Sequence, residues 1–156
     1  MADYPFLAEM LVEAGYPPSV MPRPTPAHAL ANRFAGLYLF NWGRPGDRGV
    51  IVEVEDRPIG AAWYRRFPAA EPGYGFVADD VPEIAIALVV DQRGRGVGQR
   101  LLAALIDAAV SSGERALSLS VSARNPAAVA IYTKAGFVRV GGDDDSPTML
   151  LDLAGR

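Results

Sequence analysis

The fold is decided by one stretch, Ile84-Ala85-Ile86-Ala87-Leu88-Val89-Val90-Asp91-Gln92-Arg93-Gly94-Arg95-Gly96-Val97-Gly98, which joins an apolar run to a glycine-rich turn. The apolar run is hydrophobic on both faces, which is typical of a strand in the middle of a sheet. An amphipathic pattern after the turn predicts a helix to about Ser112. Glycines let the backbone approach a ligand, and free N–H groups at a helix start attract anions. The stretch therefore predicts a phosphate-binding turn, although a plain connection that requires glycine is the alternative.

Two familiar phosphate-binding motifs can be compared with this turn by their spacing. The NTPase loop requires G-x-x-x-x-G-K-S/T, and the only lysine of the chain, Lys134, lies far from the turn. The dinucleotide motif requires G-x-G-x-x-G, whereas Gly94, Gly96 and Gly98 are evenly spaced and Leu101 stands where a third glycine is expected. The spacing thus excludes the NTPase loop and leaves a dinucleotide site as the less favoured alternative.

A third motif fits the turn, because Arg93, Gly96 and Gly98 follow the pattern R-x-x-G-x-G. A second block, from Asn125 to Phe137, reads N-P-A-A-V-A-I-Y-T-K-A-G-F. These blocks resemble the R/Q-x-x-G-x-G/A turn and the N-x-x-A-x-x-L/I-Y-x-x-x-G-F segment of the GNAT acyltransferase superfamily, in the same order and at a familiar separation. The resemblance covers residues 50–153 and is weaker in the N-terminal third.

The resemblance implies an α/β fold with a mixed central sheet, mostly antiparallel, flanked by about four helices. Its fourth and fifth strands are parallel and splay apart. The periodicity predicts strands at residues 50–55, 59–66, 84–90, 117–122, 137–140 and 148–153, and helices at residues 3–15, 26–39, 97–112 and 126–135. The first helix, capped by Asp3, begins almost at the N-terminus, so the strand that usually precedes it is expected to be absent or displaced. We expect one GNAT acyltransferase domain over residues 1–156.

The resemblance also implies acetyl-CoA as the acyl donor, bound in the wedge between the parallel strands. Its pantetheine arm would pair with the end of the fourth strand, and its pyrophosphate would lie against the turn. The residues implied in binding are Leu88, Val89, Val90, Arg93, Gly94, Arg95, Gly96, Val97, Gly98, Gln99 and Asn125. Asn125 precedes Pro126 and is equally suited to cap the following helix.

The family's proton-transfer roles fall on Tyr132 and Glu83. A phenol with a pKa of about 10 can return a proton to a departing thiolate, so Tyr132 would be the general acid. Its spacing with Ala128 and Ile131 is equally typical of a core aromatic. Glu83, at the start of the fourth strand, would take a proton from the incoming amine, often through water. The alternative is a solvated charge at a strand end.

Composition excludes several other classes of protein. The chain has 156 residues, a net charge of −3, no cysteine and one histidine, His28, which we interpret as a surface residue. Nucleic-acid binding, thiolate chemistry and a histidine-rich metal site are therefore disfavoured, and no metal is expected. No apolar run has the length of a membrane helix, so we expect a cytoplasmic protein. The run Asp143 to Asp145 fits a solvated turn or, near the acceptor groove, a region that attracts a cationic amine.

The resemblance thus implies an N-acetyltransferase that moves an acetyl group from acetyl-CoA to a primary amine by direct attack in a ternary complex. The alternative is a non-catalytic acyl-CoA-binding module with a regulatory or structural role. The sequence offers no motif that identifies the acceptor, so a small molecule and a peptide are both retained. Dimers are common in the family, and a homodimer is left open.

Overall fold

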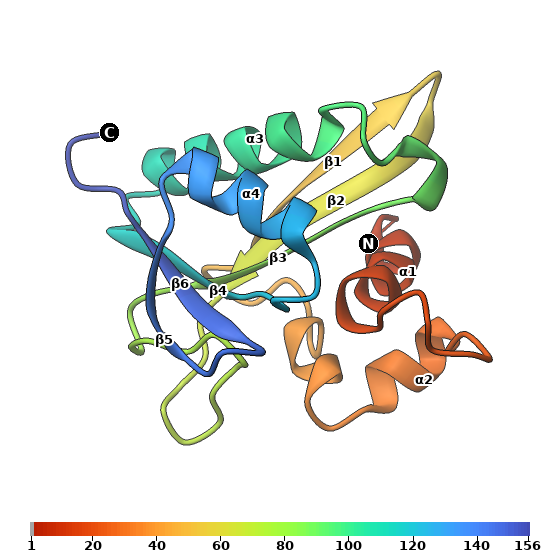
Figure 1. Ribbon diagram of the computed structural model, residues 1–156, viewed down its shortest axis with the longest axis horizontal. Coiled ribbons are helices and arrows are strands. Elements are labelled where there is room, and N and C mark those ends of the chain that lie inside the picture. Colours follow the sequence, from red (N-terminus) through yellow and green to blue (C-terminus); the bar gives the residue numbers. More distant parts are fainter. Residues whose placement is uncertain (1) are drawn as a thin grey trace.

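A computed structural model describes residues 2–156 and shows one mixed sheet with helices on both faces (Figure 1). The strands are β1 (Arg48–Val54), β2 (Arg57–Arg65), β3 (Glu83–Leu88), β4 (Ala116–Ser120), β5 (Val138–Gly142) and β6 (Pro147–Asp152), in the order β1-β2-β3-β4-β6-β5. The helices are α1 (Tyr4–Gly15), α2 (Pro26–Ala31), α3 (Val97–Ser111) and α4 (Pro126–Ala135), with 3-10 helices η1 (Ala35–Tyr38) and η2 (Val90–Gln92). Among residues 2–156, no helix combines the length and hydropathy of a membrane span.

The parallel pair of the sheet is the feature that positions the site. β3 and β4 run parallel and pair at one position, Glu83 opposite Ser118, whereas all other neighbouring strands are antiparallel. Beyond Glu83 the two strands diverge. This arrangement confirms the predicted mixed sheet with a splayed parallel pair. No strand precedes α1 in the described chain, so the expected fourth and fifth strands are β3 and β4 here.

The alternation of side chains along β3 builds a core on each face of the sheet. Ile84 and Ile86 pack in a cluster with α3 and α4, whereas Ala85 and Ala87 pack in a second cluster with α1 and η1. Full burial of one aliphatic side chain stabilises a fold by roughly 1.5–3 kcal/mol. Two buried faces confirm the prediction that this strand is central.

The predicted helix over residues 26–39 was wrong, because it is interrupted at Asn32. Thr25 caps the start as expected, and its hydroxyl accepts a hydrogen bond from the His28 N–H at 3.1 Å. The Asn32 side chain then accepts bonds from the N–H groups of Phe34 at 2.9 Å and Ala35 at 3.0 Å. An asparagine that bonds nearby backbone competes with the helical ladder. The chain therefore turns and begins again as η1.

Three smaller differences have local causes. β3 ends at Leu88 instead of Val90, because the next residues wind into η2. The Asp3 side chain makes no capping hydrogen bond, since its own backbone is already helical at φ −88° and ψ −10°. The predicted hairpin around Asp56-Arg57 is confirmed, but its tight turn is made by Glu55 and Asp56 at φ 51° and 60°. Such positive φ angles suit two-residue hairpin loops.

Candidate active site

The turn after β3 presents an open row of backbone donors. The six N–H groups from Gly94 to Gln99 donate no hydrogen bond to any residue between 2 and 156. Gly94 and Gly96 adopt φ 74° and 77°, and a Cβ at either position would meet no atom within 4 Å. Gly96 is also the N-cap of α3. Unbonded donors at the start of a 15-residue helix form a site suited to an anion such as a pyrophosphate.

The arginines near this turn are not equivalent. Arg95 is exposed and forms no ion pair within the described chain. Arg93 instead contacts the Glu13 carboxylate of α1 at 2.8 Å and donates to the Leu88 carbonyl at 3.1 and 3.3 Å. Glu13 also pairs with Arg23 at 3.1 Å. The guanidinium of Arg93 therefore lies between α1 and the end of β3.

The backbone of β3 offers different groups to its two neighbours. The Val89 N–H donates to the Ile59 carbonyl at 2.9 Å, so Val89 faces β2. Backbone groups alternate in an antiparallel pair, and Leu88 and Ile86 therefore face the wedge toward β4. Of the three residues predicted to pair with pantetheine, only Leu88 faces the wedge, since Val90 lies in η2. Ile86 was not among the residues predicted to face the wedge. Ile86 lies two residues before Leu88, so its backbone groups face the same side.

Tyr132 is held in α4 beside the wedge. Asn125 caps this helix, because its Oδ1 accepts a hydrogen bond from the Ala128 N–H at 3.2 Å. The Tyr132 side chain is 9% exposed and meets Phe137 edge to face, with ring centroids 5.8 Å apart. Burial raises the pKa of Tyr132 above its ordinary value of 10.0. The phenol therefore keeps its proton at neutral pH, as a general acid must.

Glu83 lies in a sealed polar pocket on the opposite face of the sheet. Its side chain is 2% exposed, so the alternative of a solvated strand-end charge is wrong. The Tyr38 hydroxyl and the Gly75 N–H both donate to Glu83 Oε1, the latter at 2.8 Å. Burial is the main cause that raises the pKa of Glu83 from 4.5 to about 7, while both hydrogen bonds oppose the shift. Such a carboxyl can take up and release a proton near neutrality.

Two buried oxygens at this pocket have no partner in the described chain: Glu83 Oε2 and Ser118 Oγ. Their residues are the register partners that join β3 to β4. The loop between β2 and β3 closes tightly over them. A Cβ at Gly73 would approach Glu83 Oε2 to 2.2 Å, and one at Gly75 would approach the Leu119 carbonyl carbon to 2.3 Å. Only glycine fits at these two points of the loop.

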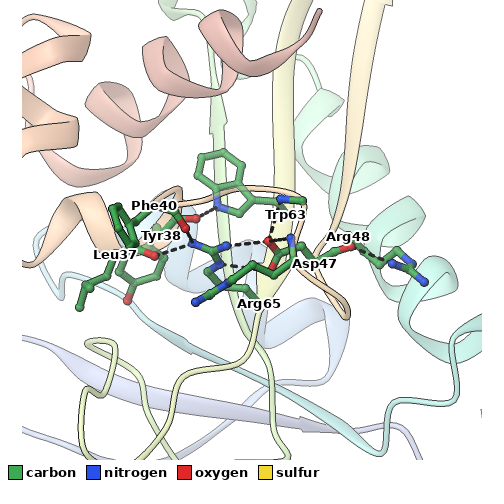
Figure 2. A network of polar contacts seen from close by, with 9 residues as sticks. Leu37, Tyr38, Phe40, Asp47, Arg48, Trp63 and Arg65 are labelled. Carbon is green, nitrogen blue, oxygen red and sulfur yellow. Dashed lines mark hydrogen bonds and ion pairs between the residues drawn. The ribbon is translucent and has the colours of Figure 1, made fainter. Parts of the chain in front are cut away.

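A buried ion pair fixes the segment that carries Tyr38 (Figure 2). Arg65 is 0% exposed and reaches Asp47 at 2.6 and 3.2 Å, and it also donates to the carbonyls of Leu37 at 2.7 Å and Phe40 at 2.9 Å. The guanidinium thus ties the backbone on both sides of Tyr38 to β2. Sequence reasoning missed this pair, because its partners lie 18 to 28 positions away along the chain.

A cavity of about 260 Å³ between α3 and α4 begins beside the anion site at Gln99 and is also lined by Ile131 and Lys134. A second cavity, of about 340 Å³, lies around Glu114 and Leu153 and contains none of the predicted site residues. The first cavity shares Gln99 with the row of donors and lies between the two helices, which cover the same face of the sheet in Figure 1.

The predicted residues therefore form two groups. The turn leads into α3, Asn125 caps α4 and Tyr132 packs in the cluster between these helices and the sheet, whereas Glu83 lies on the α1–η1 face with Tyr38. His28 is exposed, as expected. Asp143 accepts hydrogen bonds from the N–H groups of the two residues that follow Asp144, which confirms a solvated turn at this run. In residues 2–156, no cluster of three or more His, Cys, Asp or Glu side chains is arranged to hold a metal.

The sequence matches the acetyltransferase (GNAT) family over residues 10–137. This match spans most of the chain, and the chain belongs to the GNAT acetyltransferase family.

Individual proteins are similar to this chain in sequence or in fold. A mycothiol acetyltransferase of Cellulomonas flavigena is 30% identical over 95 residues, which are 60% of this chain and 27% of the relative. The chain thus spans about a quarter of the length of that curated relative. The structure of a ribosomal-protein-alanine N-acetyltransferase from Brucella melitensis has a TM-score of 0.71 at 25% identity, covering 97% of this chain and 95% of that one. YncA of Salmonella typhimurium, a putative acetyltransferase solved with acetyl-CoA, has a TM-score of 0.70 at 19% identity, covering 99% and 91%.

Proposed function

We propose that this chain is an N-acetyltransferase that transfers an acetyl group from acetyl-CoA to a primary amine by direct attack in a ternary complex. The observation that carries the proposal is the row of unbonded N–H groups from Gly94 to Gln99, at the point where β3 diverges from β4. Membership of the acetyltransferase family supports it. The relatives are named for a ribosomal-protein alanine and for mycothiol, so their names leave the acceptor open.

The chain's own groups fit the donor molecule. When bound, acetyl-CoA supplies the thioester that the amine attacks. The N–H groups of the turn would hold its pyrophosphate, and the exposed Arg95 adds positive charge beside them. The Leu88 N–H and the backbone of Ile86 would face the pantetheine arm. Asn125 uses Oδ1 for its cap, which leaves its side-chain NH₂ for a ligand.

Tyr132 would protonate the sulfur that leaves. Its hydroxyl makes no hydrogen bond to another described residue, so the proton is not committed to a protein acceptor. Its raised pKa keeps the group neutral until a strongly basic thiolate forms nearby. The family motif around Tyr132 supports the same role.

Glu83 would accept the proton that the attacking amine loses. Because its side chain is 2% exposed, we place a water between the amine and the carboxylate. A buried water needs two to four polar partners, and the unpartnered Glu83 Oε2 and Ser118 Oγ supply two. One proton leaves the amine nitrogen for the water, and one leaves the water for Glu83.

Calorimetry with acetyl-CoA, followed by a thiol-release assay with a panel of primary amines, tests the proposal. We expect micromolar binding and turnover with at least one amine. Tight binding with no turnover above background would favour the alternative of a regulatory binding module. Thermal stabilisation by NAD but not by CoA would instead favour a dinucleotide site. The single domain over residues 1–156, the homodimer and the cytoplasmic location stay predictions.

A further inference from the structure

Two large aromatic side chains are exposed beside the Glu83 pocket. Phe34 is 55% exposed and Tyr74 is 60% exposed, and their ring centroids lie 6.2 Å apart. They come from the segment before η1 and from the loop between β2 and β3. Water-exposed aromatic rings that gather from separate segments are a common feature of binding surfaces.

The backbone that carries each ring is fixed by a hydrogen bond to a side chain. The Asn32 side chain accepts a hydrogen bond from the Phe34 N–H at 2.9 Å, and the Tyr38 hydroxyl accepts one from the Tyr74 N–H at 2.9 Å. The Tyr74 ring stacks on the buried Tyr38 ring, with centroids 6.0 Å apart and planes 17° apart. A surface that is ordered before binding loses less conformational entropy when a ligand arrives.

The aromatic surface and the buried carboxylate belong to one network. The Tyr38 hydroxyl that receives the Tyr74 N–H also donates to Glu83 Oε1. Independently, the two unpartnered oxygens, Glu83 Oε2 and Ser118 Oγ, mark a place for a further polar group at the inner end. Through Tyr38, this network joins exposed rings at its outer end to unpartnered oxygens at its buried inner end.

The outer and inner ends of this network carry different charges. The Arg33 guanidinium lies 5.7 Å from the Phe34 ring centroid and makes the outer end cationic. A second cation there is disfavoured, whereas an amine at the inner end meets an acidic group. A ligand with an amine at one end and a flat apolar group at the other matches both ends.

We propose that Phe34 and Tyr74 form the acceptor subsite and that they bind an aryl group carried by a primary amine, with the amine directed toward Glu83. The inference rests on the proposed function and adds the chemical class of the acceptor. Phe34 and Tyr74 set specificity here, and Glu83 keeps the role of the base.

The test compares 2-phenylethylamine with 2-aminoethanol, which have the same aminoethyl unit. We expect the wild-type kcat/KM to be higher for the aryl amine by about tenfold or more, as is usual for an apolar group in a pocket. Tyr74→Ala and Phe34→Ala should each remove most of this preference through KM, and leave 2-aminoethanol almost unchanged. Phe40→Ala is the matched control, because Phe40 is 64% exposed and lies outside the ring contacts.

A second measurement does not depend on turnover. Saturation-transfer NMR should show 2-phenylethylamine bound to the wild type and to Phe40→Ala, with the signal lost in Tyr74→Ala. Equal use of both amines, or equal effects of Tyr74→Ala and Phe40→Ala, would overturn the subsite while the acetyltransferase proposal stands. Aryl-amine binding that depends on Tyr74, without any acetyl-CoA binding, would overturn the proposed function and, with it, the role of these two rings as an acceptor subsite. A lower sedimentation coefficient in Tyr74→Ala, with no aryl preference, would identify the surface as a contact between copies and also overturn the subsite.

Discussion

The polar groups on the two sides of the wedge between β3 and β4 differ in their exposure and in their hydrogen bonding. On the α3–α4 side, the N–H groups from Gly94 to Gln99 donate to no described residue, and a Cβ added at Gly94 or Gly96 would meet no atom within 4 Å. On the α1–η1 side, Glu83 is 2% exposed and receives hydrogen bonds from Tyr38 and Gly75. An open row of donors is suited to holding a large anion, and a sealed carboxyl is suited to a raised pKa. The row of free donors and the carboxyl with the raised pKa therefore lie on opposite faces of the same sheet.

The largest effect is expected on the open side. Gly96→Glu places a carboxylate in front of the donors, where like charge opposes a pyrophosphate by several kcal/mol. We expect CoA affinity to fall at least about a hundredfold in calorimetry.

Gly113→Glu is the control for this variant, because Gly113 has the same φ of 77° and open space around its Cβ position, but lies after α3. It should lose similar stability and keep its CoA affinity. Retained binding in Gly96→Glu would place the anion site elsewhere.

The next largest effect is expected on kcat, for a substitution at Tyr132. Tyr132→Phe removes the proposed proton donor and should lower kcat more than about tenfold, while CoA affinity stays nearly constant. Tyr64→Phe removes a hydroxyl from the same core cluster and should leave kcat unchanged. Rapid-quench or thiol-release kinetics measure both variants. Unaltered turnover in Tyr132→Phe would remove this residue from the acid role.

The role proposed for Glu83, on the α1–η1 side, can be tested by the pH dependence of kcat/KM. Glu83 must be ionised to take a proton, so kcat/KM should rise with pH and level off above a pKa of about 7. Glu83→Gln should lower the plateau by about tenfold or more and abolish this limb of the profile, measured with the same amine. Glu114→Gln, at a carboxylate that pairs with Arg66, should keep the wild-type profile. A limb that persists in Glu83→Gln would assign the base to another group.

The raised pKa of Glu83 also predicts how the free energy of unfolding changes with pH. The folded pKa of Glu83 lies above its ordinary value of 4.5, so the protonated carboxyl is favoured in the folded state. The stabilisation is full below pH 4.5 and is lost as pH rises to about 7. Relative to Glu83→Gln, the wild-type free energy of unfolding should therefore fall across this window by at most about 3 kcal/mol. Denaturant titrations at several pH values measure it, and a difference that does not vary with pH would argue against the raised pKa.

The smallest effect is expected on CoA affinity, when the ion pair between Arg93 and Glu13 of α1 is removed. Arg93 is held by Glu13, so Glu13→Gln should free the guanidinium for a pyrophosphate. A partly exposed ion pair contributes up to about 1 kcal/mol, and we expect CoA to bind about threefold more tightly. Arg23→Gln removes the other partner of Glu13 and should give no such gain. Weaker binding in Glu13→Gln would show that Arg93 acts from its present position.

Sequence and structure agree best where the site is built from consecutive residues. The turn around Gly96 and the helix start at Pro126 follow from local spacing, and both lie where the sequence predicts. The Glu83 pocket combines Tyr38, Gly75 and Ser118 from separate segments, and no local pattern reports such distant pairings. The predicted helix over residues 26–39 failed for a related reason, because a side-chain bond from Asn32 overrode an apolar periodicity.

The tight loop over Glu83 has a consequence for how this site can diversify. Side chains at Gly73 and Gly75 would collide with the Glu83 carboxylate and the β4 backbone, so mutation at these two positions is constrained. Between them, the Tyr74 side chain points into water and carries no such restriction. A duplicated gene could therefore change Tyr74, and with it the surface beside the loop, while the buried surroundings of Glu83 are inherited unchanged.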